Sequence, residues 1–420
     1  MDKKQLKKDY LWNTLAGMMD AASSVVYLAF VTQILGVYEG GIFALAYAIA
    51  QQFLTVGLYD VRTFQATDLK ETYSFGVYFS TRIITCVVMI AGVAVYGCLT
   101  NGWSYSALVF FLVGIVKFFD AFEDVFQGFL QQHKRLDLAG RAKFGRILTT
   151  VVLFLVTMLI SRNLVISLLV AIGCSTVVLV LLNFPPVMKR TRIEPQFKFK
   201  LIRSLLVVCF PLFVGSFLYT FLGTAPRFAI ETFLSVDDQA YFAIIFMPAM
   251  VINLGSAILF RPLLTSMADF WEQKNLKSLN ELLFKGIGFA LALTVVVVGL
   301  AIPFGAPVLS FIYGVDVYPY LLPLVIILIG GGLNALSLIM YYMLVIVRKQ
   351  KIVMLGYGSG AAVITGLAYA LVPFISIMGA ALSYIGGMLV LDAIFFGVVF
   401  YNIDKAKKAP VKSLQKTSAE

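Results

Sequence analysis

The sequence has few of the residues on which most catalytic and metal sites depend. Its one histidine, His133, is followed by Lys134 and Arg135, so histidine-based metal sites and Ser/His or Cys/His nucleophilic arrangements have little to draw on. The four cysteines, at positions 86, 98, 174 and 209, show no CxxC spacing, which favours small apolar packing residues over a disulfide or zinc framework. No GxxxxGK[ST] loop occurs, so ATP would have to be used by another chain. We expect no enzyme, no metal and no cofactor.

Charge is also scarce. Only 13% of the 420 residues are charged, 60% are hydrophobic and the mean hydropathy is +0.91, values that exclude a soluble domain of this length. The formal net charge of +11 is spread over short polar segments between apolar runs, which argues against a nucleic-acid partner and favours contact with membrane lipids. The sequence therefore predicts an all-α, polytopic membrane protein.

The apolar runs are long enough for about twelve transmembrane helices, because a span needs about 20 predominantly apolar residues. The predicted spans are residues 10–35, 40–59, 76–98, 104–130, 143–161, 164–184, 203–232, 239–262, 282–304, 320–346, 352–373 and 378–402. Placing both termini in the cytoplasm puts all but four of the 33 Lys and Arg on the cytoplasmic side or at cytoplasmic helix ends. The basic groups on that side include Lys134 to Arg146 and Lys189 to Arg203.

The longest basic interruption divides the chain into halves. We predict an N-terminal six-helix bundle over 1–184, a basic cytoplasmic linker over 185–202, a C-terminal six-helix bundle over 203–402 and a disordered basic cytoplasmic tail over 403–420. Residues 35–62 align with 234–261 at a fixed offset, with Arg62 opposite Arg261. Such a repeat indicates parallel halves, a known plan for transporters that bind their cargo between the halves.

Five charges lie inside predicted spans: Arg82, Lys117, Asp120, Arg227 and Asp392. A charge at the centre of a membrane helix costs about 2.5 to 3.5 kcal/mol on insertion scales and marks a functional site by default. Three of the five are cations, which indicates a partly cationic cavity and an anionic cargo.

Three segments carry a family resemblance: residues 13–68 with their GLYDVR exit (57–62), residues 224–264, and residues 312–351. They resemble bacterial polysaccharide flippases of the multidrug/oligosaccharidyl-lipid/polysaccharide (MOP) exporter superfamily, and the likeness extends over essentially the whole chain. The resemblance implies two six-helix bundles around a V-shaped central cavity in the bacterial plasma membrane. It also implies that a polyprenyl-diphosphate-linked oligosaccharide is moved to the outer leaflet by alternating access. Whether a glycan polymerase and export machinery act as partners stays open.

Diphosphate binding would suit Arg82, Lys117 and Arg227, because guanidinium groups grip phosphate oxygens bidentately and lysine acts as a point charge. Each has an alternative role: Arg82 can reach the headgroups, and Lys117 and Arg227 can neutralise Asp120 and Glu231 on their own helices.

Arg62 and Arg261 stand at cytoplasmic helix ends, where they serve either as a gate or only as a topology signal.

The carboxyls of Asp20, Asp120 and Asp392 either couple transport to a proton or sodium gradient or pair with neighbouring cations. Two other functions compete with flipping. A proton- or sodium-coupled drug or metabolite antiporter of the same superfamily would share the fold, although a cationic cavity disfavours the export of cations. An integral-membrane glycan polymerase would need a large loop, and no interval between the predicted spans is long enough.

Overall fold

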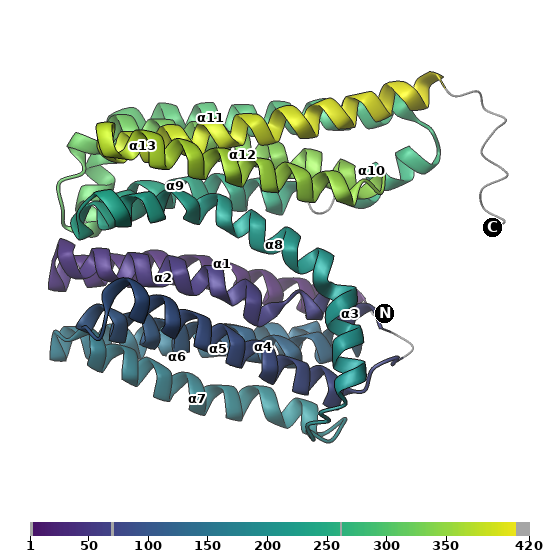
Figure 1. The fold of residues 1–420 in the computed structure, drawn as a ribbon. Coiled ribbons are helices and arrows are strands. Elements are labelled where there is room, and N and C mark those ends of the chain that lie inside the picture. Colours follow the sequence, from purple (N-terminus) through teal and green to yellow (C-terminus); the bar gives the residue numbers. More distant parts are fainter. Residues whose placement is uncertain (1–2, 69–70, 261–262, 409–420) are drawn as a thin grey trace. The chain divides into compact units, whose positions relative to one another are not determined.

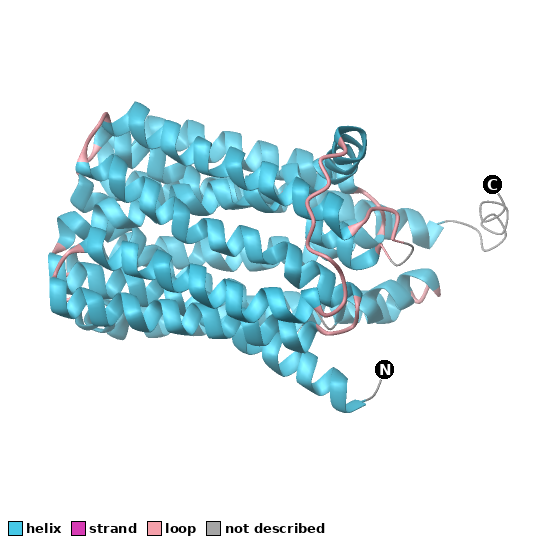
Figure 2. Ribbon diagram, turned by 90° about the horizontal axis from the view of Figure 1, so that it is seen from below, coloured by secondary structure: helices cyan, strands magenta, loops and turns pink. Residues whose placement is uncertain are grey.

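The computed structural model describes residues 3–68, 71–260 and 263–408, and these are helical apart from short connections, with no strand (Figure 2). The predicted all-α fold is confirmed. The helices are α1 (Lys3–Leu35), α2 (Val37–Leu58), α3 (Val61–Thr67), α4 (Phe75–Asn101), α5 (Tyr105–Gln132), α6 (Leu136–Ser161), α7 (Leu164–Met188), α8 (Phe199–Phe233), α9 (Val236–Phe260), α10 (Leu263–Glu272), α11 (Leu276–Tyr313), the 3₁₀ turn η1 (Tyr318–Tyr320), α12 (Leu321–Ile346) and α13 (Gln350–Lys408).

The helix α13 is two helices joined at a sharp break. Ile375 and Ser376 leave the helical region, and Ser376 adopts a left-handed φ of 55°, which a non-glycine residue rarely does. The segments 350–374 and 377–408 are each longer than the about 20 residues that a span requires. Eleven helices are long and apolar enough to cross a membrane, α13 being one of them. Counting its two segments separately gives twelve across the described ranges, as predicted.

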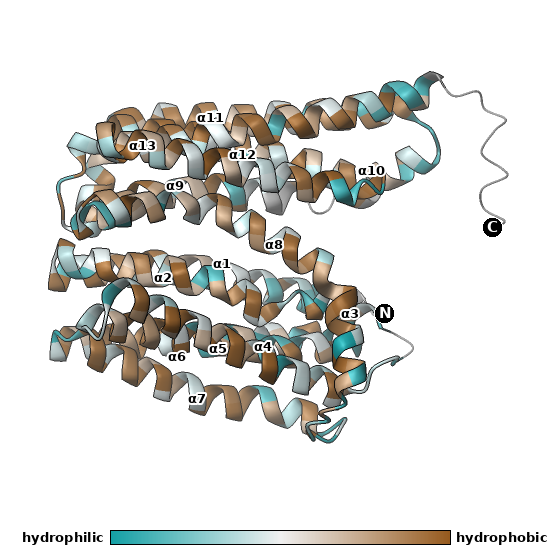
Figure 3. Ribbon diagram, in the orientation of Figure 1, coloured by the Kyte–Doolittle hydropathy of each residue, from teal (hydrophilic) through white to brown (hydrophobic). Residues whose placement is uncertain are grey.

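The hydropathy of the residues along the helices agrees with this count of membrane-spanning segments. Apolar residues run along α7, and hydrophilic residues gather at its end and in the segment that follows (Figure 3). The long apolar helices therefore indicate a multi-pass membrane protein.

The contacts between helices divide the chain into two compact units. The first unit comprises residues 1–224, 235–244 and 310–315, and the second comprises residues 225–234, 245–309 and 316–420. The first boundary between these units falls within α8, between residues 224 and 225, and the division into two six-helix bundles stays a prediction. The non-helical part of the predicted linker is shorter, at 189–198. Residues 403–408, expected in a disordered tail, continue α13, and the rest of that tail lies outside the described residues.

The first unit is built around α5, which packs against α2, α3, α4, α6 and α7 (Figure 1). The helix α1 packs along α6. Gly140 makes that approach possible, since a side chain there would collide with the backbone of Trp12 and Asn13. Aromatic side chains, among them Phe75, Phe126 and Phe129, fill the core near the start of α4 and the end of α5.

The second unit is organised by three consecutive glycines of α12. A side chain at Gly330 would strike Tyr384 of α13, one at Gly331 would strike Ala249 of α9, and one at Gly332 would strike Thr294 of α11. Small residues allow such close approach between membrane helices. The helix α12 is thus enclosed on three sides.

Candidate functional site

One face of α5 carries a line of polar side chains. Lys117, Asp120, Glu123, Asp124 and Gln127 follow one another at intervals of three, three, one and three residues, which places them along one side of a helix. Lys117, Glu123, Asp124 and Gln127 are buried and Asp120 is half-buried. Because α5 lies at the centre of the first unit, this face meets cations from α3, α4 and α6. We call these side chains, the cations that contact them and the Lys143–Asp20 pair beside them the α5 network. Its members are Asp20, Arg62, Arg82, Lys117, Asp120, Glu123, Asp124, Gln127, Lys143 and Arg146.

Asp124 bridges two arginines. Its Oδ2 accepts a hydrogen bond from Arg82 Nη2 at 2.7 Å, and its Oδ1 accepts one from Arg62 Nη1 at 3.3 Å. The Arg82 side chain is 1% exposed, and its Nη1 donates to the carbonyl oxygen of Gly57. That carbonyl belongs to the last turn of α2, where backbone oxygens lack intrahelical partners. Arg62 reaches the same carboxylate from α3, with 27% of its side chain exposed.

Two successive left-handed residues explain why Arg62 faces this site. Tyr59 and Asp60 have φ values of 45° and 50°, which ends α2 at Leu58 and starts α3 in a new direction. The Asp60 carboxylate accepts a hydrogen bond from the Ser216 hydroxyl of α8, and Arg62 Nη1 also donates to Gln127 at 2.6 Å. Arg62 is therefore held against α5 by Asp124 and Gln127.

A second part of the α5 network joins α5 to α6. Arg146 grips Glu123 with two hydrogen bonds, Nε to Oε2 at 2.8 Å and Nη2 to Oε1 at 2.9 Å, and contacts Asp120 Oδ1 at 2.5 Å. The other oxygen of Asp120 accepts from Lys117 Nζ at 3.0 Å. Lys117 also lies 4.4 Å from the ring centre of Tyr47, a cation–π geometry.

The remaining link joins α6 to α1. Lys143 Nζ donates to Asp20 Oδ2 at 2.7 Å, with 24% and 35% of the two side chains exposed. Of the two roles predicted for Asp20, pairing with a cation is the one that the contacts support.

The network is nearly balanced in charge. Within the described part of the chain it contains five cations and four carboxylates in three groups of ion pairs: Arg62 and Arg82 with Asp124, Lys117 and Arg146 with Asp120 and Glu123, and Lys143 with Asp20. The sequence interpretation left two roles open for Arg82 and Lys117: cations of a partly cationic cavity, or a headgroup contact for Arg82 and neutralisation of Asp120 for Lys117. In the structure each has a carboxylate partner: Asp124 of the neighbouring helix α5 pairs with Arg82, and Asp120 of its own helix pairs with Lys117.

Sequence reasoning missed Arg146, Lys143 and Glu123. The first two were assigned to the basic group at a helix end, because the predicted span began at residue 143, whereas α6 begins at Leu136. Arg146 thus lies ten residues, about 15 Å, inside the helix. One available signal was the spacing of Asp120 and Glu123, which puts two carboxylates on the face that Lys117 occupies.

Two other residues that the sequence predicted for the site, Arg227 and Asp392, lie in the second unit. Arg227 of α8 is buried, and Asp392 of α13 accepts a hydrogen bond from Ser337 of α12 at 2.6 Å. Asp392 is 7% exposed, and its Oδ2 is buried without a hydrogen-bond partner among the described residues. Arg261 lies outside the described residues.

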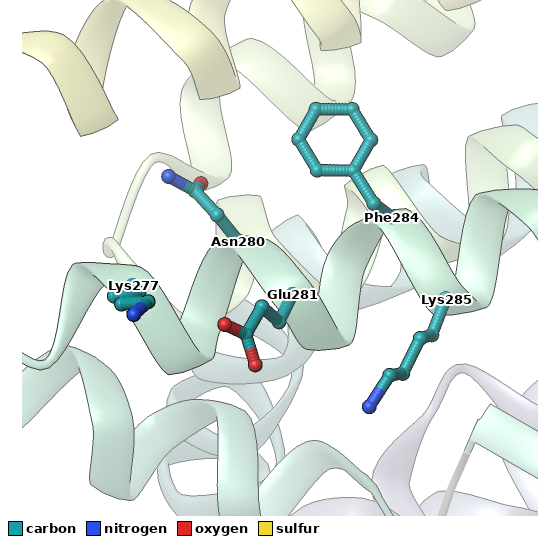
Figure 4. A pocket seen from close by; sticks show the side chains of 5 residues that line it. All are labelled: Lys277, Asn280, Glu281, Phe284 and Lys285. Carbon is teal, nitrogen blue, oxygen red and sulfur yellow. The ribbon is translucent and has the colours of Figure 1, made fainter.

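Neither a metal site nor the cavity on α11 offers a better candidate for a functional site than the α5 network. In residues 3–68, 71–260 and 263–408, no group of three or more His, Cys, Asp or Glu side chains is arranged to hold a metal ion. A cavity of 550 Å³ in the second unit is lined by Lys277, Asn280, Glu281, Phe284 and Lys285, all from α11 (Figure 4). Its charges follow one helix at four-residue intervals, the pattern of a surface-exposed face.

Comparisons with known proteins agree with this architecture. An inward-facing multidrug resistance MATE family transporter of the MOP superfamily matches with a TM-score of 0.71 at 15% identity, covering 94% of this chain and 96% of its own. A MATE transporter of Vibrio cholerae matches with a TM-score of 0.62 at 12% identity, covering 96% and 98%. A MOP superfamily transporter from Pyrococcus furiosus, described as having a binding pocket of reverse polarity, matches with a TM-score of 0.52 at 15% identity, covering 96% and 94%.

These identities establish the fold alone. No curated protein matches the sequence. The sequence pattern of the family "Polysaccharide biosynthesis protein" matches residues 6–267, which is more than half of the chain. The protein is a member of the polysaccharide biosynthesis protein family, and its fold is the one seen in MATE transporters of the MOP superfamily.

Proposed function

We propose that this protein flips a polyprenyl-diphosphate-linked oligosaccharide across the plasma membrane by alternating access. Membership of the polysaccharide biosynthesis family supports this cargo class. The observation that carries the proposal is the carboxylate of Asp124 held between Arg62 and Arg82. Two guanidinium groups converging on one anionic group form a geometry that also suits phosphate oxygens.

In this proposal Asp124 keeps the arginines neutralised while the carrier is empty. An incoming diphosphate takes over the hydrogen bonds of Arg62, whose side chain is the more exposed, and then those of Arg82. The carboxylate returns when the cargo leaves, which limits how tightly the anion is held. Arg62 lies at the start of α3, and Arg82 lies near the start of α4. These helix ends are on the same side of the first unit as the basic connections 133–135 and 189–198. If that end is cytoplasmic, as the distribution of positive charge predicts, the cargo is taken from the leaflet in which it is made.

The test is translocation of a fluorescent polyprenyl-diphosphate oligosaccharide in proteoliposomes. Arg62→Gln and Arg82→Gln should reduce flipping at least tenfold, and Arg203→Gln, which removes an exposed cation of α8, should not. Asp124→Asn gives a second readout that does not depend on tolerance of arginine loss. It should tighten binding of the diphosphate lipid while slowing release. Equal binding by Asp124→Asn and the native chain would contradict the exchange of partners.

A proton- or sodium-coupled antiporter of the same superfamily is the second candidate. Two observations favour it: the α5 network is almost neutral, which removes the argument from a cationic cavity, and Asp392 has a buried oxygen without a partner among the described residues. A carboxyl in such a site is suited to take up a proton or a small cation. Asp392 would have the same coupling role in an ion-driven flippase.

Ion dependence separates these candidates. An antiporter would exchange a cationic drug for protons or sodium, and Asp392→Asn would abolish that exchange. A gradient-driven flippase would move the lipid-linked glycan, and Asp392→Asn would remove the effect of the gradient while leaving downhill flipping. The polymerase alternative receives no support, because the longest non-helical connection among the described residues is 189–198.

A further inference from the structure

A groove lies between α6 and α7 at the basic end of the first unit. Its volume is 470 Å³, and it is lined by the start of α6 and the end of α7, two helices that pack side by side (Figure 1). Four of its lining residues are cations: Arg135 and Arg141 from the α6 side, and Lys189 and Arg190 from the α7 side. The groove thus collects positive charge from two helices, unlike the cavity on α11.

The four cations differ in how they are held. Arg135 pairs with Asp137, its Nε lying 2.9 Å from Oδ1. Arg190 donates to the Pro186 carbonyl oxygen at 2.7 Å, which bends its side chain back over the last turn of α7. Arg141 and Lys189 are exposed. Among the described residues Arg141, Lys189 and Arg190 form no ion pair, so three positive charges at the groove lack a carboxylate.

The deeper part of the groove is apolar. Leu181 and Leu182 line it and are 63% and 41% exposed, and Pro185 forms its edge nearer the cations. From Leu181 to Lys189 the helix rises about 12 Å. This distance takes the groove from the charged end into the apolar part of α7, which is the most apolar of the candidate spans among the described residues.

We infer that this groove binds one anionic phospholipid. Its phosphate would lie among Arg141, Lys189 and Arg190, and one acyl chain would follow Leu181 and Leu182. Charges at a membrane interface attract anionic lipids generally; this arrangement adds a concave floor and a fixed distance between phosphate and acyl-chain contacts. An acidic peptide would match the cations and leave the apolar floor exposed, and a neutral lipid would match the floor and leave the three cations without partners.

A tryptophan of the chain, Trp12, can report by its fluorescence on a lipid bound in the groove. Trp12 of α1 lies beside Arg141, whose guanidinium carbon is 5.1 Å from the ring centre of Trp12. The other two tryptophans, Trp103 and Trp271, can be replaced by Phe, which leaves Trp12 as the only indole. A bromine atom on the acyl chain of a lipid in the groove would quench its fluorescence.

The experiment compares quenching of Trp12 by brominated phosphatidylglycerol and brominated phosphatidylcholine in vesicles at equal mole fractions. We expect an association constant at least about fivefold higher for the anionic lipid, the contribution of roughly one interfacial cation. The variant Arg141→Gln/Lys189→Gln/Arg190→Gln should bring the ratio to about one. The matched control, Arg348→Gln/Lys349→Gln/Lys351→Gln, removes three exposed cations from the connection between α12 and α13 and from the first turn of α13, and it should leave the ratio unchanged.

Four outcomes would overturn the inference. Equal quenching by the two lipids would show that the groove does not select an anion, and an equal loss of selectivity in the matched control would show only general surface attraction. Displacement of the brominated lipid by millimolar inorganic phosphate would identify a site for a free anion. Stronger displacement by a polyprenyl diphosphate than by excess phosphatidylglycerol would assign the groove to the cargo. Since quenching is read without transport, failure here leaves the proposed flippase activity standing.

Discussion

Replacing Arg146 by Gln should destabilise the protein more than any other single change in the α5 network. The Arg146 side chain is 2% exposed, and its partner Glu123 is 0% exposed. Without Arg146, Glu123 keeps a buried charge and loses two charge-assisted hydrogen bonds, whereas Asp120 still contacts Lys117 at 3.0 Å. Removing one partner of a buried ion pair costs about 3 to 5 kcal/mol.

Glu123→Gln should cost less, because Arg146 keeps its contact with Asp120 and the amide retains one acceptor. The expected cost is about 1.5 to 3 kcal/mol, the range for a hydrogen bond to a charged group. The double variant carries no unpaired charge at this position, so it should cost less than the sum of the single variants. The expected coupling lies within about 0.5 to 3 kcal/mol.

Equilibrium unfolding in mixed micelles, followed by far-ultraviolet circular dichroism, measures these differences. Arg203→Gln serves as the control for loss of an exposed arginine and should change the unfolding free energy by less than about 0.5 kcal/mol. The reasoning is refuted if Glu123→Gln costs as much as Arg146→Gln, or if the costs of the single variants simply add. Either result would mean that Glu123 is not left with an uncompensated buried charge.

Two further predictions concern parts of the fold outside the network. Burial acts to raise the pKa of Asp68, but the backbone N–H groups of Thr72 and Tyr73 and the Tyr78 hydroxyl hold it below its ordinary value. The stabilisation by Asp68 is therefore present above the ordinary pKa of about 3.9 and is lost as the pH falls through the lower native pKa. Between pH 7 and pH 3, the melting temperature of Asp68→Asn should therefore decrease less than that of the native protein. Gly331→Val should destabilise the protein by about 1 to 3 kcal/mol, since a side chain there meets Ala249. Gly397→Ala, with open space around it, should be neutral or stabilising in the same unfolding measurement.

The sequence predicts the number and the approximate limits of the long helices because hydropathy reports length along the chain. The break at Ile375 and Ser376 falls inside the predicted interval between the last two spans, and α12 ends at the predicted residue, Ile346. The start of α6 was placed seven residues too late. Its first turns are polar, and Asp137 N donates to the Asp9 carboxylate of α1 at 2.8 Å. A cap that comes from another helix leaves no local signal in the sequence.

The candidate site was predicted only in part, for a related reason. Hydropathy identifies Arg82 and Lys117 as charges within apolar runs, but their partners depend on which helices are neighbours and on how each is rotated. Arg82 meets Asp124, 42 residues away in the sequence, and Arg146 meets Glu123, 23 residues away. The i,i+3 pair of Lys117 and Asp120 is the one contact of the network that spacing on a single helix could anticipate.

The pairing changes how intramembrane cations in the proposed carrier should be interpreted. An empty carrier that exposed five unpaired cations to a low-dielectric environment would incur a desolvation cost for each, whereas a network of five cations and four carboxylates carries an excess of one charge. Binding an anion then becomes an exchange of partners and not the filling of a vacant positive site. Three of the four carboxylates, Asp120, Glu123 and Asp124, belong to α5, whereas Arg62, Arg82, Lys143 and Arg146 come from α3, α4 and α6. A displacement of α5 relative to these helices would therefore change the availability of several cations together, and the proposed alternation between binding and release of a diphosphate requires such a change.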